Sequence, residues 1–127
     1  MSEYVAFEAL QALAVPELPA SACDCSVGAC LSWEPVPGHR WPKEVMQKLG
    51  TLRESFDVEP GFDEFHPEGT RYESEHAPIA PRSFPYNRCD VHRCTACRRV
   101  LLKYTEAGGY YVEDRVRELR VELVVDA

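Results

Sequence analysis

The chain has 127 residues, of which 45% are hydrophobic and 28% charged, and its formal net charge is −7. This length excludes two independent hydrophobic cores, so residues 1–127 are expected to form a single domain. No stretch approaches the roughly 18 apolar residues of a membrane-spanning helix, and the N-terminus has neither the basic nor the apolar region of a secretory signal. We therefore expect a cytoplasmic protein with no membrane partner.

Prolines interrupt the first two thirds of the chain. Residues 3–13 are apolar and fit either a strand or a short helix. Residues 42–49 are predicted to form a helix, with Pro42 in its first turn and Gly50 at its end. Five prolines between positions 60 and 85 exclude a long helix there, because proline lacks a backbone N–H and restricts the residue before it.

The proline-rich region, residues 54–88, also holds most of the negative charge. Eight carboxylates between Glu54 and Glu75 face a single basic residue, Arg71. Aromatic residues are interleaved with these acids, namely Phe56, Phe62, Phe65 and Tyr72. The simplest expectation is an exposed loop whose aromatic side chains dock on the core. The alternative is a surface that captures something basic.

The last third of the chain is the most regular part. Residues 98–105 are rich in strand-forming side chains, residues 106–109 contain a Gly-Gly turn, and a return strand is expected to continue to about residue 119. The predicted fold class is therefore α+β, mostly β with few helices. It combines a C-terminal β-hairpin with a long proline-rich loop.

The six cysteines form two clusters, Cys23, Cys25 and Cys30 in the first and Cys89, Cys94 and Cys97 in the second. In a reducing compartment this number favours a metal site over disulfides. The pair Cys94-x2-Cys97 is the most specific signal, because two thiolates so spaced in a tight turn reach one Zn²⁺. A structural zinc supplies folding free energy on the order of 10 kcal/mol to a small domain.

A Cys-x2-Cys turn that leads directly into a β-hairpin resembles the second knuckle of a zinc ribbon, over residues 89–119. The glycine usual after the second cysteine is replaced by Arg98. The resemblance implies a first knuckle at Cys25-x4-Cys30. The predicted ligands of a structural zinc are thus Cys25, Cys30, Cys94 and Cys97, with Cys23, Cys89 or His92 as replacements.

Three other interpretations of these residues remain open. The cysteines fit buried thiols or disulfides, and Cys89-x4-Cys94-x2-Cys97 matches the start of a plant-type [2Fe–2S] loop. His66-Pro67-Glu68 together with Cys94-x2-Cys97 matches the zinc-deaminase signature, which makes a zinc-dependent hydrolase or deaminase a remote alternative. That signature requires a helix after Cys97, where the sequence favours a strand, and Arg93 stands in place of its proline.

The charge pattern favours a protein without catalytic residues. We expect a small, acidic, zinc-stabilised protein that binds a basic protein partner, by analogy with inhibitors and immunity proteins that neutralise basic toxins through charge complementarity. The alternative is a zinc-ribbon-type nucleic-acid-binding or transcription accessory module. It would use the cations around the second cysteine cluster, namely Arg88, Arg93, Arg98, Arg99 and Lys103. We expect these cations instead to pair with the acids of residues 54–75.

Overall fold

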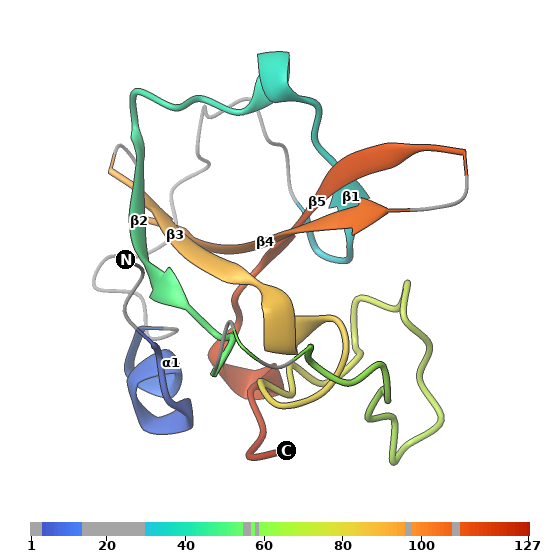
Figure 1. Ribbon diagram of the computed structural model, residues 1–127. Helices are drawn as coiled ribbons and strands as arrows, with labels where there is room; N and C mark the ends of the chain where they lie inside the picture. The colour runs from blue at the N-terminus through green and yellow to red at the C-terminus, as the bar shows by residue number, and fades with distance from the viewer. Residues whose placement is uncertain (1–3, 14–29, 55–56, 58, 96–97, 108–109) are drawn as a thin grey trace.

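The computed structural model describes residues 4–13, 30–54, 57, 59–95, 98–107 and 110–127. Within these residues the chain forms one antiparallel sheet of five strands in the order β1-β5-β4-β3-β2, with one α-helix beside it (Figure 1). The elements are α1 (Phe7–Leu13), β1 (Glu34–Pro35), β2 (Met46–Thr51), β3 (Asp90–Cys94), β4 (Val100–Ala107) and β5 (Val112–Glu118). The expectation of a small, mostly β domain with few helices is confirmed. None of the described helical turns is long and apolar enough to cross a membrane.

The predicted C-terminal hairpin is confirmed. Strands β4 and β5 pair in register from Leu101 opposite Glu118 to Ala107 opposite Val112, and β5 ends within one residue of the expected position. Strand β4 lies at the centre of the sheet, where Val100, Leu101 and Leu102 are all buried. A strand covered on both faces needs consecutive apolar residues, which explains why this run does not alternate.

The predicted helix over residues 42–49 is wrong, because the chain turns there and then enters β2. β2 pairs with β3, and the register shifts between Lys48 and Gly50, so that Leu49 is an extra residue in a β-bulge. The helix was expected from Pro42 in a first turn and Gly50 as a stop. Pro42 instead precedes a turn at residues 43–45, and Gly50 lies inside β2 directly after the bulge.

The N-terminal segment combines both structures that its sequence allowed. Tyr4 forms an isolated parallel bridge with Thr51 of β2, and the Val5 N–H donates a hydrogen bond of 2.8 Å to the Thr51 carbonyl. The chain then forms α1, whose Leu10 is fully buried. The helix is only seven residues long and depends on this packing for its stability.

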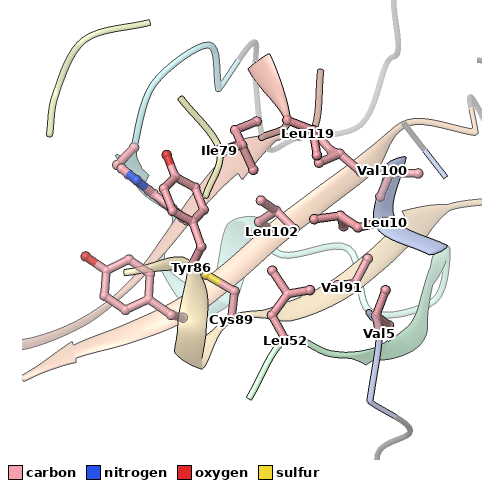
Figure 2. Packing of buried hydrophobic residues seen from close by; sticks show 13 residues of the cluster. Val5, Leu10, Leu52, Ile79, Tyr86, Cys89, Val91, Val100, Leu102 and Leu119 are labelled. Carbon is pink, nitrogen blue, oxygen red and sulfur yellow. The ribbon is translucent and has the colours of Figure 1, made fainter. Parts of the chain in front are cut away.

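Two apolar clusters cover opposite faces of the sheet. The main core lies between the sheet, α1 and the loops, and includes Val5, Leu10, Leu52, Ile79, Tyr86, Cys89, Val91, Val100, Leu102 and Leu119 (Figure 2). The smaller cluster on the other face contains Cys30, Val36, Leu101 and Val116, with Trp41 and Met46 packed against it. Neighbouring residues Leu101 and Leu102 of β4 therefore belong to different clusters, as the alternation of a strand requires.

Residues 60–85, all of which the structure describes, form turns and extended segments with no strand or α-helix, as their prolines predict. Arginine and asparagine side chains bind the backbone of this loop. The Arg88 guanidinium donates to the carbonyls of Pro60 (3.1 Å) and Gly61 (2.8 Å), and the Asn87 amide donates to the Gly61 carbonyl (2.9 Å). Because backbone groups without ladder partners must be paired elsewhere, these contacts hold the loop in place.

Arg117 of β5 makes the most buried of these contacts. Its side chain is fully buried and donates hydrogen bonds to the Ala77 carbonyl (2.9 Å), the Glu75 carbonyl (3.1 Å) and the hydroxyl of Tyr86. Burial lowers the pKa of Arg117 from its ordinary value, but arginine stays charged at neutral pH. A buried guanidinium with several acceptors thus joins the sheet to the loop.

We predict that Arg117→Ala lowers the free energy of unfolding by about 3 kcal/mol, because it takes the buried donor away from the Tyr86 hydroxyl and the Ala77 carbonyl. Urea denaturation followed by circular dichroism measures this change. The control is Arg82→Ala, since Arg82 forms a largely exposed ion pair with Asp126 at 2.9 Å. An exposed pair contributes about 0.5 kcal/mol. Equal effects of the two substitutions would contradict the structural role of Arg117.

Candidate metal centre and acidic surface

The structure describes two of the four predicted zinc ligands. Cys30 and Cys94 are both fully buried, whereas Cys25 and Cys97, like the replacement ligand Cys23, lie outside the described residues. In the described part of the chain, no three or more His, Cys, Asp or Glu side chains form a group that could hold a metal ion. The zinc site therefore stays a prediction, and the geometry around Cys30 and Cys94 is what bears on it.

The turn between β3 and β4 reverses the chain directly after Cys94. The N–H of Cys94 donates to the Arg99 carbonyl (2.8 Å), and the N–H of Arg98 donates to the Cys94 carbonyl (2.6 Å). Arg98 has φ 67°, the left-handed conformation that glycine adopts most easily. Arg98 therefore takes the backbone conformation favoured by glycine at the very position where a zinc knuckle usually has one.

Cys30 has the same unusual conformation, with φ 49°. Among the described residues, Cys30 and Arg98 are the two non-glycine residues with positive φ. Such residues are strained by about 1–2 kcal/mol and gather at functional sites. Both belong to the segments that the sequence assigns to the two halves of one metal centre.

The register of the sheet places Cys30 and Cys94 on the same face. His92 pairs with Leu101, which belongs to the smaller cluster together with Cys30. Cys94 lies two residues beyond His92 on β3, so its side chain is on this same face. Cys30 is held beside β5, because its carbonyl accepts a hydrogen bond of 2.8 Å from the N–H of Glu118. The fold thus places one cysteine of each cluster, Cys30 and Cys94, on the same side of the sheet.

Burial, followed by the nearby carboxylate of Glu34, raises the pKa of the Cys30 thiol to about 12. The thiol is therefore protonated at neutral pH, and a thiolate there needs a cation to stabilise it. Zn²⁺ provides such a charge and is suited to a thiol donor set. The thiols of Cys30 and Cys94 are thus of the donor type that the predicted ion prefers.

The replacement ligand Cys89 lies in the main core, on the other side of the sheet from Cys30. Its thiol is fully buried and donates to the Pro85 carbonyl (3.3 Å), and burial raises its pKa well above the ordinary value. Cys89 is therefore a core thiol. This placement also removes support from the [2Fe–2S] interpretation, which requires Cys89 beside Cys94.

His92 and His66 differ in what surrounds them. Burial, followed by repulsion from Lys103, lowers the pKa of His92 to about 4, and its ring packs edge-on against Trp41 at 5.0 Å. His66 uses both ring nitrogens within the loop, with Nε2 2.7 Å from Glu64 and Nδ1 2.8 Å from Thr70. No ring nitrogen of His66 is thus left for a metal in this arrangement, so the deaminase interpretation gains no support.

The acidic loop, defined here as residues 54–75, exposes its charge. All eight of its carboxylates are exposed. Among the described residues, Asp63, Glu68 and Glu73 have no ion pair. Among the described aromatic residues of the loop, Tyr72 docks as predicted by stacking against Trp33, whereas the side chains of Phe62 and Phe65 are 65% and 37% exposed. Phe56 lies outside the described residues.

The cations around the second cysteine cluster pair mostly within the sheet. Arg99 lies 2.6 Å from Glu118, and Lys103 lies 3.7 Å from Asp114. Arg88 pairs with an acid of the loop, with 3.7 Å between its guanidinium and the Glu59 carboxylate. The expected pairing with the acidic loop is therefore confirmed for Arg88 and wrong for Arg99 and Lys103, because the hairpin register places acids of β5 closer to them.

Sequence reasoning missed the arginines of β5. Arg115 donates to the hydroxyls of Tyr72 (3.1 Å) and Tyr111 (3.2 Å), while Arg117 is buried as described above. The alternation Arg115-Val116-Arg117 is typical of a strand with one solvent-exposed face, and so it gave no signal of a buried cation.

Comparison with known proteins finds no family model, no curated protein and no solved structure that matches this chain. Its site has to be interpreted from its own chemistry.

We predict one zinc ion per chain, detected by mass spectrometry of the native protein, because Cys30 and Cys94 from the two cysteine clusters lie on one face of the sheet. Cys94→Ser should remove the ion and destabilise the fold, since structural zinc binding is coupled to folding. Cys89→Ala is the matched control and should retain the ion. Iron in place of zinc, or equal metal loss in both variants, would contradict the proposed ligands.

Proposed function

We propose that this protein acts without catalysis, as a zinc-stabilised interaction protein whose acidic loop binds a basic protein partner. The supporting observation is the exposure of all eight carboxylates of the loop. A loop that used its acids for its own stability would pair them with the arginines nearby. Here Asp63, Glu68 and Glu73 have no ion pair among the described residues.

The loop is also held in a defined shape. Arg88 and Arg117 bind its backbone carbonyls at Gly61 and Glu75, and Tyr72 anchors its C-terminal end through stacking and through a hydrogen bond with the Tyr104 hydroxyl. Such a loop presents its charges with little entropy left to lose on binding, which favours affinity. Inhibitors of the immunity type rely on charge complementarity of this kind, with fast association driven by electrostatic steering.

The alternative of a nucleic-acid-binding module has weaker support. Phosphate contacts need free cations, and Arg88, Arg99 and Lys103 are each paired with a carboxylate. The net charge of −7 adds repulsion at long range. Measurable binding of DNA or RNA at low salt would favour this alternative over the proposal.

The proposal predicts that the triple variant Asp63→Lys, Glu68→Lys, Glu73→Lys loses its partner. A tagged chain in an extract of its host should capture a basic protein, identified by mass spectrometry. The purified pair should then weaken at least tenfold with the variant, because each substitution turns attraction into repulsion. Binding to the native chain should also weaken as salt increases.

A variant with the same total charge is the control. Glu8, Glu44 and Glu122 are exposed and lie outside the acidic loop, so changing all three to Lys alters the net charge equally. This control should bind as the native chain does. If both variants weaken binding equally, overall charge explains the effect and the acidic loop is not the binding surface. Capture of no basic protein would contradict the proposal itself.

A further inference from the structure

The hairpin of β4 and β5 extends beyond the rest of the sheet. β3 pairs with β4 only as far as Lys103, and β1 pairs with β5 only at Arg115 and Val116. The outer residues of β4 and β5 therefore pair with each other alone, and Figure 1 shows this end of the hairpin projecting away from the other strands. The end of the hairpin is therefore open to a partner that does not contact the rest of the sheet.

The end of this hairpin is apolar and exposed. The hairpin tip, defined here as Tyr110, Tyr111 and Val112, has exposed fractions of 103%, 49% and 72%. Exposed aromatic and aliphatic side chains grouped on a projecting element mark an interaction site more often than chance. The ring of Tyr110 has no ring contact within the described part of the chain, so both of its faces are open to a partner.

Acidic side chains flank the hairpin tip. Glu106 of β4 lies directly opposite Glu113 of β5, an arrangement of like charges that destabilises a strand pair. Arg115 offsets the charge of Glu113 at 2.8 Å, whereas Glu106 has no ion pair among the described residues. A cation brought by a partner would remove this repulsion.

Arg115 also connects the hairpin tip with the acidic loop. Its guanidinium donates to Tyr111 in the tip and to Tyr72 in the loop, and it lies over the Tyr72 ring at 5.7 Å. The two segments, far apart in sequence, thus form one continuous surface. Within this surface, arginine already pairs with aromatic rings, since Arg88 lies over Phe62 at 4.4 Å.

From these observations we infer that the hairpin tip is the second half of the binding surface and receives arginine side chains of the basic partner. This inference rests on the proposed function and adds to it a preference for arginine over lysine side chains in the partner. A guanidinium stacks on an exposed tyrosine ring such as that of Tyr110 through its flat face, and the carboxylate of Glu106 adds negative charge nearby. An ammonium is more strongly hydrated and cannot stack in this way. The acidic loop supplies long-range attraction, and the tip supplies selectivity.

The test compares oligo-arginine and oligo-lysine peptides of equal length by isothermal titration calorimetry. The native chain should bind oligo-arginine more tightly. In Tyr110→Ser/Val112→Ser the affinity for oligo-arginine should fall by about two- to fivefold, the contribution of one exposed cation–π contact. Affinity for oligo-lysine should change little, while Tyr110→Phe should retain the preference for arginine.

Leu31→Ser is the matched control, because Leu31 is 41% exposed and follows Cys30, which binds the far end of β5. It should bind both peptides as the native chain does. The charge-reversed loop variant should weaken both peptides equally. Failure of the native chain to bind either peptide would overturn the proposed function together with this inference.

Two results would overturn the inference alone. The first is binding without a preference for arginine, or a preference that persists in Tyr110→Ser/Val112→Ser. The second is a dimer of the native chain, found by sedimentation at increasing concentration and absent in the same variant. That dimer would mean that the tip is covered by a second copy of this chain.

Discussion

The structure depends on supplying hydrogen-bond donors to the backbone carbonyls of residues 60–85, a long loop without strand pairing. Buried carbonyl groups need donors, and prolines between residues 60 and 85 remove the option of a helix or a strand. Arginine side chains supply the donors, since a guanidinium offers five N–H groups in a fixed plane. Arg117 reaches the loop from β5, where its full burial excludes competing water. The loop therefore folds against the sheet although most of its own side chains are polar, and its carboxylates remain directed to solvent.

The sheet separates two kinds of chemistry. One face carries the main core, in which Cys89 is an ordinary buried thiol. The other face carries Cys30, with Cys94 placed there by the alternation of β3. A strand covered on both sides makes this separation strict, because a shift of one residue would exchange the faces of all its side chains. The left-handed conformations of Cys30 and Arg98 are a cost that the apolar packing on this face has to offset.

How much of this could be predicted depended on how local the signal was. The β4–β5 hairpin was predictable because strand-forming residues flank a Gly-Gly pair in the sequence. β2 was not, because Pro42 and Gly50 are also typical of the ends of a helix, whereas here Pro42 precedes a turn and Gly50 lies in the bulged strand. Cys94 and Cys97 were predicted as zinc ligands from a local spacing, whereas the placement of Cys89 depends on which side of β3 it packs. The burial of Arg117 could not be predicted, because its partner is a backbone carbonyl 40 residues away and a carbonyl leaves no pattern in the sequence.

The two outer strands of the sheet have a further consequence. β1 is two residues long and ends in Pro35, which has no N–H to offer, and β2 is distorted by its bulge. Short, proline-containing and bulged edges are poor templates for another strand, so the sheet resists edge-to-edge aggregation. A molecule with open edges would risk polymerising if it also exposed an aromatic arm. Because both edges are blocked, association through the hairpin tip is limited to side-chain contacts and does not extend into a shared sheet.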